Sequence, residues 1–167
     1  MEPTRGRPER RGLVVGLGNV LRTDDGVGFA AVERLEADAR LAAVARAGDL
    51  RIFWAQQLTP ELAVDFAAAD VVVVVDADTG LPPGAVSSRR VAAASPKAGG
   101  ASMTHQVDVA SLAAMAADLY GGAPEVYVVG VGPAALEVGE ELTPLVTDAL
   151  PEVVEAVVQL LGVAPAD

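Results

Sequence analysis

Five consecutive valines, residues 71–75, are followed directly by Asp76 and Ala77. A short run of apolar, β-branched residues is typical of a strand that is buried on both faces of a parallel sheet. The run is far shorter than the roughly 20 apolar residues that a membrane-spanning helix needs. We therefore predict a central strand over residues 71–77 that ends in an aspartate.

Similar short apolar segments alternate with helical patterns along the chain. Apolar residues recur with a helical period after Asp24-Asp25-Gly26, and Thr59-Pro60-Glu61 predicts the N-cap and first turn of a further helix. The predicted strands cover residues 13–18, 50–55, 71–77, 84–92 and 126–131. The other predicted helices cover residues 109–120 and 142–160, where Pro151 either kinks the helix or begins a second one.

This alternation predicts an α/β fold with three layers. We expect a mostly parallel, twisted sheet of about five strands with helices on both faces, and residues 84–92 at its edge in an undetermined direction. A length of 167 residues suits one domain. We expect a flexible leader over residues 1–12, a single α/β domain over residues 13–162 and a short tail over residues 163–167.

The charge of the chain excludes several kinds of partner. A formal net charge of −11 repels phosphate backbones and anionic lipid headgroups, so nucleic acid and membranes are poor candidates. The chain contains no cysteine, which excludes disulfides, thiolate metal ligands and a cysteine nucleophile and is compatible with a reducing compartment. We expect a monomer in the cytoplasm.

Two aspartates and the only histidine are predicted to meet at one end of the sheet. Right-handed crossovers tend to place the third strand beside the first, opposite the second. Asp25 follows the first strand and Asp76 ends the third, so both face the crevice where the winding reverses. His105 precedes the helix over residues 109–120, whose positive end favours a neutral imidazole. Such a ligand set suits zinc, nickel, iron or manganese.

Each of these residues also has an ordinary structural interpretation. His105 could be a surface or capping residue, and Asp76 could hydrogen-bond a loop. Asp24 and Asp25 could be acids at a helix start. The metal-site hypothesis therefore depends on the three side chains lying together.

Two other kinds of site fit the sequence poorly. Gly16 and Gly18 lie between a strand and a helix as in a dinucleotide-binding loop, but Leu21 occupies the position of the third glycine. A serine hydrolase is not indicated, because the chain has no Gly-x-Ser-x-Gly motif. Ser102 and Ser111 are near the histidine only in sequence.

The order of the motifs is similar to that of a known family. Residues 16–28 have the sequence Gly-Leu-Gly-Asn-Val-Leu-Arg-Thr-Asp-Asp-Gly-Val-Gly, and Asp76-Ala77 and His105-Gln106 follow. Val129-Gly-Val-Gly-Pro133 and Leu142-Thr-Pro144 complete the series. Together these motifs, over nearly the whole chain, resemble the hydrogenase maturation endopeptidases.

The resemblance implies a protease that removes the C-terminal extension of a nickel-iron hydrogenase large-subunit precursor after nickel insertion. It implies that Asp25, Asp76 and His105 are the metal-binding and catalytic residues, and that they recognise nickel already held by the precursor. The isolated protein would then need no bound metal. Asp25 or Asp76 could alternatively be the general base of an aspartic-type endopeptidase. Asn19 and Gln57 are candidates for substrate contact, although each could serve only its own loop.

Two further functions remain open at this point. One is a metal-binding or chaperone module for hydrogenase assembly without proteolytic activity, and the other is a small-molecule hydrolase that uses the same acids. The expected partner is the large-subunit precursor. The segment Gln56–Glu61 leaves the hydrogenase type undetermined.

Overall fold

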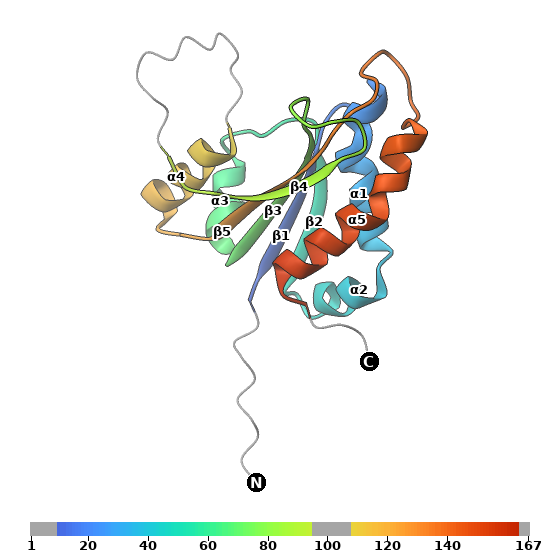
Figure 1. Cartoon of the computed structure of the whole chain (residues 1–167). Helices are drawn as coiled ribbons and strands as arrows, with labels where there is room; N and C mark the ends of the chain where they lie inside the picture. The colour runs from blue at the N-terminus through green and yellow to red at the C-terminus, as the bar shows by residue number, and fades with distance from the viewer. Residues whose placement is uncertain (1–9, 95–107, 164–167) are drawn as a thin grey trace, which may run out of the picture.

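The computed structural model describes residues 10–94 and 108–163 of the chain, and Figure 1 shows a central sheet between two groups of helices. The elements follow one another in the order β1 (Gly12–Leu17), the 3-10 turn η1 (Thr23–Gly26), α1 (Val27–Glu36), α2 (Ala39–Arg46), β2 (Leu50–Ala55), α3 (Leu62–Ala68), β3 (Val71–Ala77), β4 (Val86–Val91), α4 (Val109–Tyr120), β5 (Glu125–Val131) and α5 (Pro144–Leu161).

The five strands form one sheet in the order β2-β1-β3-β5-β4. Strands β1, β2, β3 and β5 are parallel, whereas β4 at the edge is antiparallel to β5. The α/β architecture is confirmed, and β3 lies beside β1 on the side opposite β2 as predicted. The structure also settles the direction of the edge strand, which the sequence left undetermined.

The valine run of β3 supplies both faces of the core. Val71, Val73 and Val75 pack in a cluster with buried residues of α1 and α5. Val72 and Val74 pack in a second cluster with buried residues of α3 and α4. This alternation follows from the two-residue period of a strand, and it means that Asp76 continues the face that α3 and α4 cover.

Helix α1 lies unusually close to β1. A Cβ atom on Gly16 would lie 2.1 Å from the carbonyl oxygen of Gly28, and one on Gly28 would lie 2.2 Å from the carbonyl oxygen of Leu17. Neither position accommodates a side chain, so the backbones of the strand and the helix touch directly. The contact fixes the start of α1, and with it the loop that carries the two consecutive aspartates.

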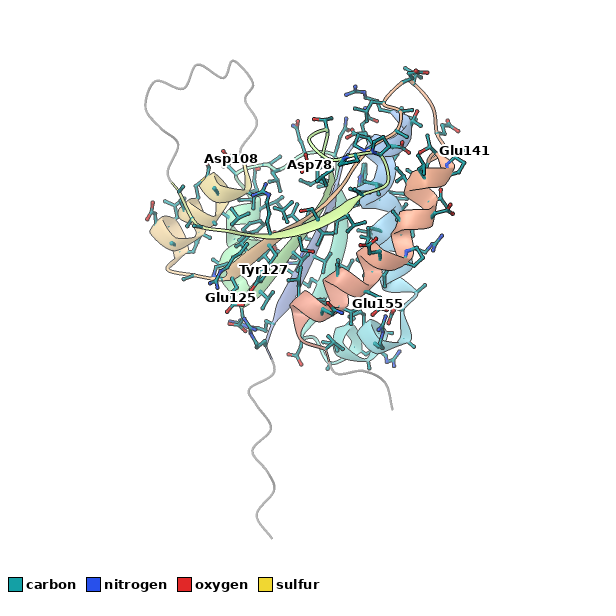
Figure 2. All side chains as sticks on the ribbon, in the orientation of Figure 1. Asp78, Asp108, Glu125, Tyr127, Glu141 and Glu155 are labelled. Atoms are coloured by element: carbon teal, nitrogen blue, oxygen red, sulfur yellow. The ribbon has the colours of Figure 1, made fainter. Side chains whose placement is uncertain are left out.

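The parallel strands direct polar residues to opposite ends of the sheet (Figure 2). Asp78, just after β3, and Asp108, just before α4, lie at the carboxyl end. Glu125 and Tyr127 lie at the other end, where Arg10 forms an ion pair with Glu125 at 2.9 Å. Because loops at the carboxyl ends of parallel strands form the ligand crevice in such folds, the carboxyl end is the expected place of a ligand site.

Two helix boundaries follow from their sequences. The Asp108 side chain accepts a hydrogen bond from the Ser111 amide at 2.7 Å and so caps α4, which ends at Gly121 with a φ of 71°. Helix α5 begins with Pro144 and continues through Pro151 as a single helix. The predicted alternative of a second helix at Pro151 is therefore wrong.

The structure differs from the sequence-based prediction at two helices. Helix α3 begins at Leu62, and Thr59 does not cap it as predicted, because the residue before the helix is Glu61 in a helical conformation. Helix α2 was not predicted, because its eight residues are too few for a clear period.

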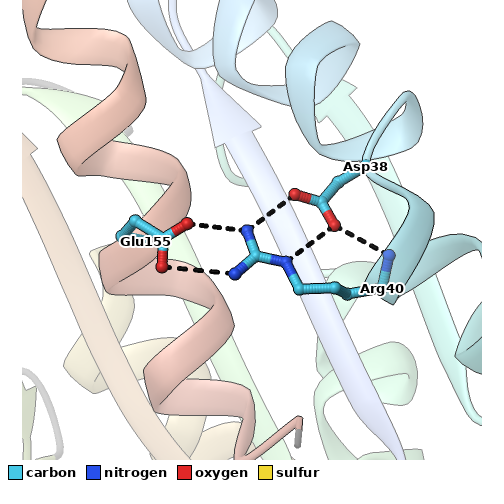
Figure 3. Close-up of polar contacts among 3 residues, drawn as sticks. All are labelled: Asp38, Arg40 and Glu155. Atoms are coloured by element: carbon cyan, nitrogen blue, oxygen red, sulfur yellow. Dashed lines mark hydrogen bonds and ion pairs between the residues drawn. The ribbon is translucent and has the colours of Figure 1, made fainter. Parts of the chain in front are cut away.

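Helix α2 is joined to α5 by an arginine between two carboxylates (Figure 3). Asp38 caps α2 by accepting a hydrogen bond from the Arg40 amide. The Arg40 guanidinium binds Asp38 at 2.8 Å and Glu155 of α5 at 2.7 Å. This contact attaches the helix at the end of the sheet away from the crevice.

None of the helices in the described ranges is long and apolar enough to cross a membrane.

Candidate active site

A cavity of about 810 Å³ lies at the carboxyl ends of β1 and β3. Asp25 and Asp76 both line it, although they are far apart in sequence, Asp25 in the turn η1 and Asp76 at the end of β3. Its wall also includes Gln57 after β2 and Asp108 before α4. The fold therefore brings the two predicted carboxylates to one place, at the point where the winding of the sheet reverses.

The position of Asp25 is set by a tight loop between β1 and α1. One carboxylate oxygen, Oδ2, accepts a hydrogen bond from the Asn19 amide at 2.8 Å. Gly18 allows this turn, because its φ of 131° favours glycine and a Cβ there would lie 1.9 Å from the Asp25 carbonyl oxygen. The loop thus aims the carboxylate by backbone contacts alone.

Asp76 is half-buried at the end of β3, and its environment disfavours the charged form. Burial raises the pKa of Asp76 to about 7, and the nearby charges of Asp25 and Asp78 add to the shift. Near neutral pH this carboxyl group can both hold and release a proton. A general acid or base in an active site has this property.

We expect Asp25→Asn to lower the pKa of Asp76, which would nevertheless stay above the usual value of about 3.9 because burial is the larger cause. Asp78→Asn should lower it less, since Asp78 is the weakest of the causes that raise it. Carboxyl carbon chemical shifts measured against pH by NMR would report the midpoint in each variant. An unchanged midpoint in Asp25→Asn would show that the two carboxylates do not interact.

The third predicted metal ligand, His105, lies outside the described residues. Within residues 10–94 and 108–163 there is no group of three histidine, cysteine or acidic side chains suited to a metal ion. Asp25 and Asp76 therefore form a pair in the described structure. The predicted three-ligand set requires His105.

The two predicted substrate contacts differ in position. Gln57 lines the cavity, where its side chain is exposed. Asn19 stabilises its own loop. Its side-chain oxygen accepts a hydrogen bond from the Leu21 backbone amide at 2.9 Å, and its own backbone amide donates one to the Asp25 carboxylate. A substrate contact by either residue stays a prediction.

Asp24, next to the candidate residue Asp25, has a role that the sequence did not indicate. It is fully buried, and its carboxylate accepts hydrogen bonds from the amides of Ala134, Ala135 and Thr143 at 2.8–2.9 Å and from the Thr143 hydroxyl. Burial alone would raise its pKa, but these donors outweigh burial and lower the pKa of Asp24. Asp24 thereby ties η1 to the segment between β5 and α5.

Three further charged residues of the cavity were also not predicted. Asp108 lines it while capping α4, and Arg22 and Arg89 line it as well. The position of Asp108 before a helical pattern could have identified it as an N-cap. Nothing in the local sequence marks the two arginines, since their place in the cavity depends on the pairing of strands and loops.

A model of the hydrogenase maturation protease family, HycI, matches residues 40–160. The matched segment is more than half of the chain. This chain belongs to the hydrogenase maturation protease family. The matched segment contains Asp76 and His105 but begins after Asp25, so the assignment of Asp25 depends on its motif and on the cavity.

Solved structures agree with the family assignment. The chain shares 27% identity with the hydrogenase maturating endopeptidase HybD from E. coli, with a TM-score of 0.69 over 91% of this chain and 92% of that one. The NiFe hydrogenase maturation protease HycI from Thermococcus kodakarensis KOD1 has 23% identity, a TM-score of 0.69 and coverage of 93% and 94%, and it shows the shared fold. No curated protein sequence matches the chain.

The family assignment decides between the functions left open above. The hydrogenase maturation proteases are endopeptidases that cleave the C-terminal extension of a hydrogenase large subunit. As a member of the family, this chain is such an endopeptidase. A non-proteolytic assembly module and a small-molecule hydrolase are accordingly disfavoured. The precursor of the large subunit is the corresponding partner.

Proposed function

We propose that this protease acts on a nickel-iron hydrogenase large-subunit precursor after nickel insertion, and that Asp25, Asp76 and His105 bind the nickel that the precursor carries. The observation that carries the proposal is the shared cavity of Asp25 and Asp76 at the carboxyl ends of two neighbouring strands. In this view the metal belongs to the substrate. The free enzyme would hold nickel only weakly.

The electrostatics of the carboxylate pair support a cation in this cavity. Asp76 is held in a site where both burial and its acidic neighbours disfavour its negative charge. A divalent ion beside Asp25 and Asp76 would relieve this repulsion and favour the ionised form. Carboxylate and imidazole ligands suit nickel among several metals.

Chain connectivity supports the inclusion of His105 in the ligand set. Asp108, Val109 and Ala110 line the cavity. His105 is three residues before Asp108, so covalent geometry limits the separation of their Cα atoms to about 11 Å. This limit allows the imidazole to reach an ion bound between the two carboxylates.

The same carboxyl group also suits the proteolytic step. We propose that Asp76 takes a proton from the attacking water as the oxygen bonds to the scissile carbonyl carbon, and that this proton passes to the leaving nitrogen as the C–N bond breaks. The pKa of about 7 applies before the metal-bearing precursor binds, and nickel beside Asp76 would lower it and keep the carboxylate ready to accept the proton. Precursor-bound nickel would supply Lewis-acid polarisation near the reacting carbonyl. This role for Asp76 corresponds to an aspartic-type endopeptidase.

The proposal predicts that the enzyme cleaves nickel-loaded precursor and leaves the nickel-free precursor intact. His105→Ala should slow the cleavage of the loaded form by about 10²-fold, because one of three metal contacts is lost. Electrophoretic separation of precursor and product over time would measure both rates. Equal cleavage of loaded and nickel-free precursor would contradict recognition through nickel.

A monomeric state and a cytoplasmic location belong to the same proposal. The absence of cysteine is compatible with a reducing compartment.

As a control for the cleavage experiment, calorimetric titration of the free enzyme with nickel should give only weak binding. Tight binding to the isolated chain would mean that the metal is the enzyme's own.

A further inference from the structure

Arg89 is one of two cations, with Arg22, on the wall of a cavity that also carries three acidic groups. Asp25, Asp76 and Asp108 line the same cavity, and the chain as a whole has a net charge of −11. Among the described residues, no carboxylate lies within ion-pair distance of Arg89. Residues 95–107, which follow the described end of this segment, contain no aspartate or glutamate. The guanidinium therefore has no acidic partner among residues 10–94 and 108–163.

The alternation of β4 explains why Arg89 faces the cavity and Arg90 does not. Val91 packs against the core cluster under α3 and α4, and Arg89 shares its face because strand side chains alternate. Arg90 shares the opposite face with Val86, which packs on the cluster under α1 and α5. There Arg90 helps to lower the pKa of Glu125, so it already has a carboxylate nearby.

The sheet register gives the separation between Arg89 and the acid pair. Arg89 lies opposite Val128 of β5, and Val128 lies opposite Val74 of β3, two residues before Asp76. Two strand spacings and two residues of rise place the Cα atoms of Arg89 and Asp76 about 12 Å apart. An extended peptide covers this distance in three to four residues.

We propose that Arg89 binds a carboxylate of the precursor chain, three to five residues from the scissile peptide bond, and thereby fixes which bond lies beside Asp25 and Asp76. The inference rests on the proposed function, because it requires a peptide in this cavity. Elsewhere in the cavity the carboxylates of Asp25, Asp76 and Asp108 repel an acidic segment, and Arg22 beside η1 is the other cation on the wall. A guanidinium recognises a carboxylate through two parallel hydrogen bonds, which specifies position as well as charge.

The test compares Arg89→Glu with Arg90→Glu, a matched charge reversal on the opposite face of the same strand. We expect Arg89→Glu to raise KM for the nickel-loaded precursor about tenfold with kcat within about twofold of wild type, since an attractive charge pair becomes repulsive. Arg90→Glu should leave both constants near the wild-type values. Thermal unfolding of both variants would show that the fold is retained.

A charge exchange provides the decisive arm of the experiment. Each acidic residue of the precursor within five positions of the cleavage site, on either side, is replaced by Lys in turn. One such precursor should be cleaved poorly by the wild type and regain a low KM with Arg89→Glu. Equal KM values for Arg89→Glu and Arg90→Glu, or the failure of every precursor variant to rescue, would overturn the role of Arg89. Failure of the proposed function looks different, because wild-type enzyme would then not distinguish nickel-loaded from nickel-free precursor.

Discussion

Asp76→Asn is expected to slow the cleavage of nickel-loaded precursor by about 10²–10⁴-fold, the usual range for the loss of a general base. The amide is nearly the same size as the carboxyl group, but it cannot take up a proton at neutral pH. It also lacks the negative charge with which a carboxylate attracts a cation. Single-turnover cleavage with excess enzyme would measure the chemical step directly. A rate within threefold of wild type would exclude Asp76 from the reaction.

The stability of Asp76→Asn separates a chemical effect from a folding defect. Because the pKa of Asp76 is raised in the folded protein, its favourable contribution is fully present below the unfolded value of about 3.9 and is lost as the pH rises through about 7. The variant carries no such group. We therefore expect Asp76→Asn to unfold at the same or a higher temperature than wild type at pH 8, while its activity is lost.

Asp24→Ala is expected to lower the free energy of unfolding by about 3–5 kcal/mol. The change removes a buried carboxylate that accepts hydrogen bonds from three backbone amides and one hydroxyl, at Ala134, Ala135 and Thr143. Hydrogen bonds to a charged group contribute about 1.5–3 kcal/mol each, and buried donors that lose their acceptor add a desolvation cost. Urea unfolding followed by circular dichroism would give the difference.

The neighbouring acid provides a matched control. Asp25 accepts one backbone hydrogen bond and is only partly buried, so Asp25→Ala should lower the free energy of unfolding by about 1 kcal/mol or less.

The pKa of Asp24 is lowered in the folded state. Its contribution to stability is therefore present above about pH 3.9 and is lost as the pH falls through the pKa that Asp24 has in the folded protein. The stability difference between wild type and Asp24→Ala should accordingly narrow in acid. Equal costs at Asp24 and Asp25 would contradict the stabilising role of the hydrogen bonds that Asp24 accepts.

The sheet could be predicted because its strands are defined by local composition. Five valines in succession have few alternatives to a buried strand, and the same reasoning located the other parallel strands. The handedness of crossovers then sufficed to place β3 beside β1, which brought Asp25 and Asp76 to one crevice. Each of these steps depends on a short segment or a general rule of chain geometry.

The remaining features depend on contacts between distant segments. The acceptors and donors of the Asp24 network are more than 100 residues apart in sequence, and no pattern around Asp24 distinguishes it from Asp25. Arg89 enters the cavity only because β4 pairs with β5 in one particular register. Helix α2 is short and is held by Arg40 against a distant helix, so it lacks a strong local signal.

The hydrogen bond from the Asn19 amide to Oδ2 of Asp25 limits how that carboxylate can coordinate an ion. Because Oδ2 already accepts this bond, Oδ1 is the oxygen better placed to bind an ion, and we expect monodentate coordination. A nickel ion that receives one oxygen from Asp25 keeps more of its coordination sphere for donors of the precursor. Release of the cleaved large subunit with its nickel would then require the breaking of only a few bonds to the enzyme.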